Sequence, residues 1–133
     1  MVDTSRHFLP VRLLYETVDA LMYNKMNVMH WHIVDEDSFP LRLVSHPELA
    51  EYGSFSSEET YSTDEVKDLV RYAMVRGVRV IPELDTPGHA YSWGRAPQNK
   101  DNACLLKKMD SGYRGPLDVT LDSTYALVGE VFT

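Results

Sequence analysis

The chain has 133 residues, with 20 acidic and 13 basic side chains and a hydrophobic fraction of 44%. This length and composition suit one domain with its own core, and no apolar run reaches the roughly 18–20 residues of a membrane span. The net charge of −7 argues against a nucleic-acid surface, which needs a basic face. The one cysteine, Cys104, excludes an internal disulfide framework and a four-cysteine zinc site.

The first quarter of the chain predicts a helix followed by a buried strand. Pro10 suits the first position of a helix, and Asn24 suits its end. Between them, one face at helical spacing is apolar: Val11, Leu14, Val18, Leu21 and Met22. Residues 27–34 (NVMHWHIV) are rich in β-branched and aromatic side chains and predict a strand, which runs into an acidic stretch at 35–40.

Residues 41–61 predict a long loop with one short turn of helix over 47–52. A helix then begins with the capping-box spacing of Ser62 and Glu65. Its apolar stripe consists of Val66, Leu69, Val70, Ala73 and Met74. Gly77 suits the position after its end, and residues 78–84 (VRVIPEL) predict a second strand, with Pro82 near the strand end because proline cannot donate to a ladder.

Residues 87–122 are rich in Gly, Pro, Asn and Asp and predict a long loop, after which a helix runs from Ser123 to the last residue. Alternating helices and strands predict an α/β fold with a parallel sheet. Both strands are close to continuously apolar, which is typical of a sheet covered on both faces. Function in such folds gathers at the carboxyl ends of the strands.

Polar side chains follow both predicted strands at these ends. One cluster is HWHIVD at 30–35, in which His30 and His32 point to the same side, and the other is ELDTPGH at 83–89. If the two strands are neighbours, Asp35, Asp85 and His89 converge on one pocket. Arg6 precedes the first helix, where its paired donors would reach a substrate oxygen.

Each of these residues also has a structural interpretation. His30 is more simply a hydrogen-bonded core residue, Asp35 and Asp85 are turn formers, and Arg6 is a solvated surface arginine. Trp31 is favoured as a core residue by its apolar neighbours. The His-x-His pair with nearby acids also fits zinc, as in metal-dependent barrel hydrolases. Two acid-and-imidazole clusters at successive strand ends nevertheless favour a site.

Three motifs in order resemble one enzyme family. DTSRH at 3–7, HWHIVD at 30–35 and ELDTPGH at 83–89 look like the β-N-acetylhexosaminidases of glycoside hydrolase family 20, eukaryotic lysosomal type. YNKMN at 23–27 and SWG at 92–94 agree in position. The likeness is strong to about residue 97 and looser over 98–133.

The resemblance implies a (β/α)₈ barrel that removes terminal β-linked N-acetylglucosamine or N-acetylgalactosamine from a glycan. The substrate's acetamido oxygen attacks the anomeric carbon, a glutamic acid protonates the leaving group, and neither metal nor cofactor is needed. By position, Arg6 resembles the arginine that binds sugar hydroxyls. Asp35 and His89 resemble the pair that supports the general acid, and Asp85 the aspartate behind them.

The same resemblance implies that this sequence holds only part of the barrel. The family's acid pair lies in a His-x-Gly-Gly-Asp-Glu segment, and the chain has no Gly-Gly. Its two Asp-Glu pairs, at 35–36 and 64–65, stand in other contexts. A whole barrel typically has about 250 residues. We therefore expect residues 1–133 to be about the first three β/α units of the catalytic domain, truncated at both ends and inactive alone.

Cys104 then resembles a cysteine whose disulfide partner follows the acid pair. The family resemblance also implies a lysosomal or secreted location, although the N-terminus has no signal peptide pattern. It further implies that full-length members form dimers. Two other functions stay open: a carbohydrate-binding remnant without catalysis, and a metal-dependent barrel hydrolase.

Overall fold

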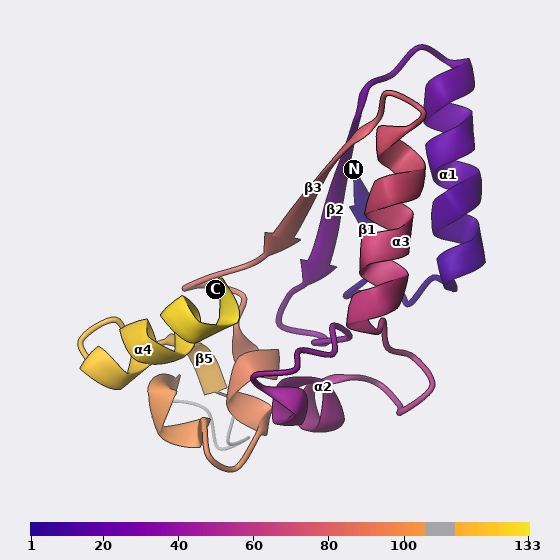
Figure 1. The fold of residues 1–133 in the computed structure, drawn as a ribbon. Helices are drawn as coiled ribbons and strands as arrows, with labels where there is room; N and C mark the ends of the chain where they lie inside the picture. The colour runs from indigo at the N-terminus through magenta and orange to yellow at the C-terminus, as the bar shows by residue number, and fades with distance from the viewer. Residues whose placement is uncertain (106–113) are drawn as a thin grey trace.

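The computed structural model describes residues 1–105 and 114–133 (Figure 1). Three parallel strands form its main sheet in chain order: β1 (Val2–Asp3), β2 (Val28–Val34) and β3 (Arg79–Leu84). The register places Asp3 beside His32, and His32 beside Glu83. The predicted parallel sheet is confirmed, and its sequential strand order is that of consecutive units of a barrel.

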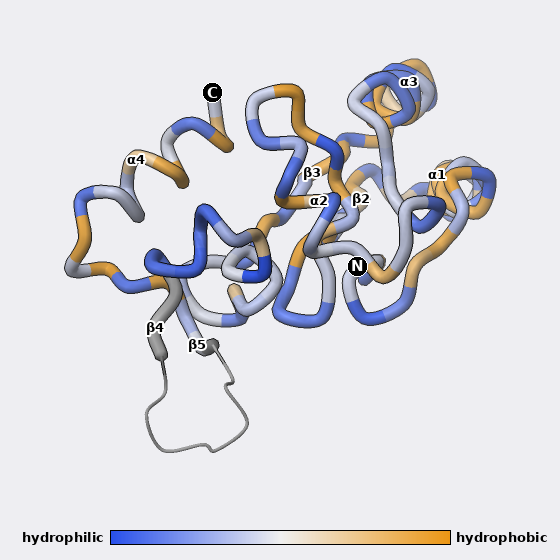
Figure 2. The backbone as a smooth tube through the Cα atoms, turned by 90° about the horizontal axis from the view of Figure 1, so that it is seen from below, coloured by the Kyte–Doolittle hydropathy of each residue, from blue (hydrophilic) through white to orange (hydrophobic). Residues whose placement is uncertain are grey.

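Two helices cover one side of this sheet, α1 (Val11–Tyr23) and α3 (Thr63–Met74). They lie side by side in both views (Figures 1 and 2), and Tyr15 meets Tyr72 edge-on with ring centroids 4.7 Å apart. The predicted capping box starts α3: Ser62 Oγ accepts from the Glu65 backbone N–H, and the Glu65 carboxylate accepts from the Ser62 N–H. Both helices were predicted within one or two residues of their ends.

The two longer strands differ in burial, which corrects the expectation that both are covered. β2 is buried over most of its length, with Trp31, Ile33 and Val34 at most 1% exposed. β3 is half-exposed, and its Ile81 is 42% exposed. The reason is position in the sheet, because β2 lies between two strands whereas β3 pairs with only one among the described residues. Pro82 lies opposite Trp31, two residues before the end of β3, near the strand end as expected.

The loop predicted over 41–61 holds one short helix, α2 (Pro47–Gly53), as expected. Its last residue meets the loop after β2 at very close range. A Cβ atom on Gly53 would lie 2.7 Å from the Phe39 Cβ and 3.2 Å from the Ser92 carbonyl oxygen. Glycine is therefore required for this approach. The Gly53 carbonyl in turn accepts from the Phe39 backbone N–H at 3.0 Å.

The segment predicted as a long loop over 87–122 has more structure than expected. It forms two 3₁₀ turns, η1 (Tyr91–Arg95) and η2 (Lys100–Asn102), and a small antiparallel sheet of β4 (Ala103–Leu105) and β5 (Arg114–Leu117). η1 forms because Trp93 is fully buried and meets Phe39 edge-on. These contacts are tertiary and leave no periodic sequence pattern. Cys104 belongs to β4, but its side chain lies outside the described part of the structure.

The last helix, α4 (Asp122–Val131), begins one residue before the predicted start. It lies at the opposite end of the molecule from α1 and α3 (Figure 1). His46, just before α2, contacts it: the His46 Nε2 lies 3.0 Å from a Glu130 carboxylate oxygen. None of the helices in residues 1–105 and 114–133 has the length and apolarity needed to cross a lipid bilayer.

Candidate functional site

A row of three polar residues crosses the sheet near its carboxyl end. Asp3, His32 and Glu83 stand beside one another on β1, β2 and β3. Neighbours in register on adjacent strands point their side chains to the same face. The His32 Nδ1 lies 2.7 Å from the Glu83 Oε2. The sheet register itself therefore builds the base of the candidate site.

Arg6 is held over this row by the turn that follows β1. The backbone N–H groups of Ser5 and Arg6 donate to the Asp3 Oδ1 at 3.0 and 3.1 Å, which closes a tight turn. Ser5 and Ser38 exchange hydroxyl-to-carbonyl hydrogen bonds at 2.9 and 2.8 Å and fasten this turn to the loop after β2. The position of Arg6 is thus set by two strand-end segments, the turn after β1 and the loop after β2.

The Arg6 guanidinium pairs with three carboxylates. Its nitrogens lie 2.6 Å from Asp35, 2.7 Å from Asp3 and 3.2 Å from Asp37. Although its burial alone would lower the pKa, these carboxylates raise the pKa of Arg6 above its ordinary value. The side chain is still 43% exposed, so part of its donor edge faces outward. Arg6 is thus exposed, as the surface interpretation expects, but its guanidinium is ion-paired rather than only solvated.

Asp35 is the most enclosed charge of the site, at 1% exposed. Its Oδ2 lies 2.7 Å from the His32 Nε2, and its Oδ1 lies 3.1 Å from the His89 Nδ1. Burial alone would raise the pKa of Asp35. The Glu36 backbone amide, the two histidines and Arg6 outweigh that effect and hold the pKa below its ordinary value of 3.8. Asp35 is therefore a buried carboxylate that stays ionised.

The second cluster approaches the first from the end of β3. His89 takes a left-handed backbone conformation, with φ of 53°, that turns its ring back to Asp35. Ligand atoms of Asp85, Glu83 and His32 lie within 4.8 Å of one another. Of the predicted convergence, Asp35 and His89 are in direct contact, whereas Asp85 lies beside His32 and Glu83 and reaches Asp35 only through His32.

His30 differs from its expected place in the core. Its side chain is 41% exposed, and its Nε2 forms a short hydrogen bond with the Glu83 carboxylate. It points to the same side as His32, as strand alternation predicts, because both rings meet Glu83. Trp31, between them, is fully buried as expected and donates from its Nε1 to the Thr4 hydroxyl at 2.9 Å.

Two groups of side chains have ligand atoms close enough to hold a metal ion. One consists of His32, Glu83 and Asp85, and the other of Asp35, Glu36 and His89. Both ring nitrogens of His32 meet carboxylate oxygens at 2.7 Å, so both carry protons and neither offers a lone pair. In the second group, the guanidinium of Arg6 already neutralises Asp35. The hydrogen bonding thus fits a proton-filled network better than a metal centre.

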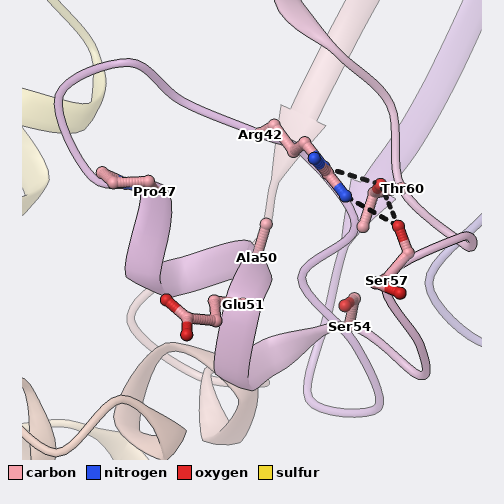
Figure 3. Close-up of a pocket in the computed structure, with 7 residues that line it drawn as sticks. All are labelled: Arg42, Pro47, Ala50, Glu51, Ser54, Ser57 and Thr60. Atoms are coloured by element: carbon pink, nitrogen blue, oxygen red, sulfur yellow. Dashed lines mark hydrogen bonds between the residues drawn. The ribbon is translucent and has the colours of Figure 1, made fainter.

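A separate hollow of about 300 Å³ lies between α2 and the loop at residues 54–60 (Figure 3). The Arg42 side chain crosses its rim and donates to the Thr60 hydroxyl and the Ser57 carbonyl at 2.8 and 2.7 Å. No member of the carboxylate and histidine network lines it. This hollow is therefore no part of the candidate site.

The full chain matches one family model, the catalytic domain of glycosyl hydrolase family 20, over residues 1–133. The chain belongs to this family. Among curated relatives, it is 46% identical over 132 residues to mouse β-hexosaminidase subunit beta and 42% identical over 133 residues to mouse β-hexosaminidase subunit alpha. Both matches include 99% of this chain, which spans only 25% of the length of each relative.

Solved structures of the family share this fold. A chitobiase of Flavobacterium johnsoniae superposes with a TM-score of 0.88 at 33% identity. The superposition includes 99% of this chain and 20% of the chitobiase chain. The N-acetyl-β-hexosaminidase of Streptomyces plicatus, in complex with thio-NAglucal, gives a TM-score of 0.72 at 29% identity over 97% of this chain and 28% of its own. The expected partial barrel is thus confirmed as the fold class.

Two residues of the site had no assigned role in the sequence interpretation. Glu83 was only part of a motif, yet its carboxylate joins His30 to His32. Asp3 was likewise named only as part of a motif, although it binds Arg6 and shapes its turn. A signal for Glu83 existed, because two histidines at i and i+2 on one strand need an acceptor on the neighbouring strand. The register that supplies it is not visible in a sequence.

The network predicts that the free energy of unfolding is greatest in mildly acidic solution. The pKa of Glu83 is lowered from 4.5 by its hydrogen bond to His32, so this contribution is lost as pH falls through the folded value. Burial alone would lower the pKa of His32, but Glu83 and Asp35 raise it above 6.5. Its contribution is lost as pH rises through that raised value. The maximum is expected between about pH 4.5 and 6.5.

Urea denaturation of the chain followed by circular dichroism from pH 3 to 9 would measure this profile. His32→Gln should remove most of the decline on the alkaline side. It should also weaken the decline on the acidic side, because the hydrogen bond to His32 is the main cause of the lowered pKa of Glu83. A wild-type midpoint that is constant from pH 5 to 9 would contradict the assignment of His32 as a charged group in the folded state.

Proposed function

We propose that this chain supplies part of the active site of a β-N-acetylhexosaminidase, which hydrolyses terminal non-reducing N-acetylhexosamine residues of glycoconjugates. The observation that carries the proposal is the ionised Asp35, hydrogen-bonded to His89 and paired with Arg6 at the carboxyl end of a parallel sheet. A domain of glycosyl hydrolase family 20 places its site at that end of the barrel.

In this proposal Arg6 binds hydroxyl groups of the terminal sugar, because it is the partly exposed cation of the cluster. Asp35 and His89 support the general acid. A network with one fixed negative charge beside a histidine can hold the proton of a neighbouring carboxylic acid near working pH. Asp85 stands behind this wall, close to Glu83 and His32.

The proposed reaction is substrate-assisted and retains the anomeric configuration. The acetamido oxygen attacks the anomeric carbon, and the acid protonates the leaving oxygen as its bond breaks; water then opens the cyclic intermediate. The acid and its neighbouring aspartate belong to a Gly-Gly-Asp-Glu segment that this sequence does not contain. The 133-residue chain should therefore show no turnover of a chromogenic N-acetylglucosaminide.

A chimera tests the proposal with the missing parts supplied. The matched segment of mouse β-hexosaminidase subunit beta, 132 residues at 46% identity, is replaced by this chain. If these residues form their share of the same site, the chimera should hydrolyse the chromogenic N-acetylglucosaminide. It should not hydrolyse the matching glucoside, which lacks the acetamido group that performs the attack.

The unaltered mouse protein and a chimera with Arg6→Lys are assayed beside it. Lysine keeps the charge of Arg6 but loses its fork of donors, so the apparent KM should rise. A chimera that elutes and melts like its parent but has no activity would overturn the proposal. Saturable binding of N-acetylglucosamine by such an inactive chimera would favour a carbohydrate-binding remnant instead.

We further propose a lysosomal or secreted glycan-processing setting and a dimeric whole protein, on the strength of the family resemblance. The stability maximum expected near pH 4.5–6.5 supports an acidic compartment.

A further inference from the structure

An unbroken line of hydrogen bonds runs from the partly exposed His30 on β2, through Glu83 on β3 and His32, to the buried Asp35. The His30 Nε2 meets the Glu83 Oε2, and the same oxygen lies 2.7 Å from the His32 Nδ1. The His32 Nε2 then lies 2.7 Å from the Asp35 Oδ2. All links are between side chains. Two of these residues, Glu83 and His32, are not among those the family resemblance assigns to the reaction.

The proton positions along this line follow from the chemistry of imidazole. A neutral ring donates from one nitrogen and carries a lone pair on the other. In either neutral form of His32, a lone pair would therefore face a carboxylate oxygen at 2.7 Å. Only the imidazolium donates to both Glu83 and Asp35. Arg6 Nη1, at 3.3 Å from the His32 Nε2, is then a nearby cation rather than a donor to it.

Burial makes this arrangement depend on its acidic partners. The His32 side chain is 6% exposed, and an isolated buried cation would give up its proton. Asp35 is 1% exposed, but the more accessible Glu83 is 37% exposed. The charged groups around the ring come from β1, its following turn, the end of β2, and β3 with its following turn: Asp3, Arg6, Asp35, Glu83 and Asp85.

We propose that Glu83 and His32 are positioning residues of the active site. Glu83 keeps His32 as an imidazolium, and His32 fixes the orientation of the Asp35 carboxylate. In this orientation Asp35 Oδ1 remains hydrogen-bonded to His89, and Asp35 Oδ2 remains paired with Arg6. The proposal rests on the proposed function for its effect on catalysis, but the protonation of His32 does not. Neither residue touches substrate in this scheme; each acts through Asp35.

The geometry explains why Glu83 matters at a distance from Arg6. Asp35 Oδ2 is shared by the Arg6 Nη2 at 2.6 Å and the His32 Nε2 at 2.7 Å. If His32 lost the proton on its Nε2, the lone pair on that nitrogen would repel this oxygen and turn the carboxylate. The turn would loosen both the ion pair with Arg6 and the hydrogen bond to His89.

Glu83→Gln tests the first half of the proposal without any assay of activity. The ring nitrogens of His32 are followed by NMR in the ¹⁵N-labelled chain as pH is varied. Removing the charge of Glu83 should lower the pH midpoint of His32 by about 1 pH unit or more. Glu48→Gln is the matched control, since Glu48 accepts from the ring of His46 at 3.0 Å, elsewhere in the fold. It should leave the midpoint of His32 unchanged.

The same substitution in the active chimera tests the second half. Glu83→Gln should reduce kcat roughly 10-fold or more with a smaller change in KM, and should move the alkaline limb of the pH profile to lower pH. Glu83→Asp keeps the charge and should restore the pH limb in part. If Glu83→Gln fails to fold, the pH midpoint of His32 is measured by the same NMR titration in Glu83→Asp. A neutral His32 in that variant, which keeps the negative charge, would contradict the proposal.

An unchanged His32 midpoint in Glu83→Gln, or an unchanged pH profile in the chimera, would overturn the inference. An inactive wild-type chimera would overturn the proposed function, whereas the titration of His32 would still decide whether Glu83 holds its proton.

Discussion

Replacing Asp35 by asparagine is expected to reduce kcat of the active chimera by roughly 10²–10⁴-fold, the range over which general acid–base assistance acts. Asparagine has nearly the same shape but no charge. Its amide would put N–H donors against the guanidinium of Arg6 or the ring of His32, both of which now donate to Asp35. The proposed acid would lose the fixed negative charge that sets its proton affinity.

The same change should also destabilise the fold. Removing one partner of a buried ion pair leaves the other uncompensated, at a cost of about 3–5 kcal/mol when both are buried. Because Arg6 remains 43% exposed, we expect a smaller loss of about 2–3 kcal/mol. Urea denaturation of the chain at pH 5.5 would measure it.

Asp37→Asn provides the matched control for Asp35→Asn. Asp37 also pairs with Arg6, at 3.2 Å, but its side chain is 48% exposed. An exposed pair contributes about 0–1 kcal/mol, so this variant should unfold close to wild type. Equal losses from the two substitutions would mean that burial of Asp35 does not set its importance, and would contradict the site as described.

The sequence predicted the members of this site better than their connections. Arg6, Asp35 and His89 stand in motifs at strand ends, and the structure brings them together. The sequence did not show, however, that Asp35 is the residue at which the contacts from Arg6, His32 and His89 meet. Side-chain alternation gives the shared face of His30 and His32. The partner that joins them, Glu83, depends on the alignment of β3 against β2, which only the folded sheet defines.

The fold was predictable where local chemistry decides it. The capping box of Ser62 and the apolar stripes of α1 and α3 predicted where these helices lie, because both signals are contained in the helix's own stretch of sequence. The 3₁₀ turn at 91–95 was missed because Trp93 forms it by packing on Phe39, more than fifty residues away in the sequence. The exposure of β3 was missed for a related reason, since burial depends on neighbours and not on the strand's own composition.

Trp31 connects the core to the charged network, because its neighbours His30 and His32 face the opposite side of β2. Its ring is fully buried, meets Tyr61 edge-on at 5.2 Å and donates to Thr4, the residue between Asp3 and the turn of Arg6. A shift of this ring would therefore move β2 and the turn after β1 together. We therefore expect the geometry of the carboxylate network to depend on Trp31, although this side chain is not a member of it.

Trp31→Ala is accordingly expected to lower the free energy of unfolding by about 3–5 kcal/mol, the usual range for a large aromatic side chain removed from a core. The cost combines lost burial, an unfilled cavity and the loss of the hydrogen bond to Thr4. Urea denaturation followed by circular dichroism measures it. If the alanine variant does not fold, Trp31→Phe keeps the test open, because it fills most of the cavity and removes the indole N–H.

Trp93→Phe separates packing from hydrogen bonding. Trp93 is as fully buried as Trp31, but its indole N–H has no hydrogen-bond partner among the described residues. Phenylalanine at 93 should therefore cost less than phenylalanine at 31, by about 1 kcal/mol, the net contribution of one hydrogen bond. If the two phenylalanine variants unfold at the same urea concentration, the bond from Trp31 to Thr4 does not anchor the turn that carries Arg6.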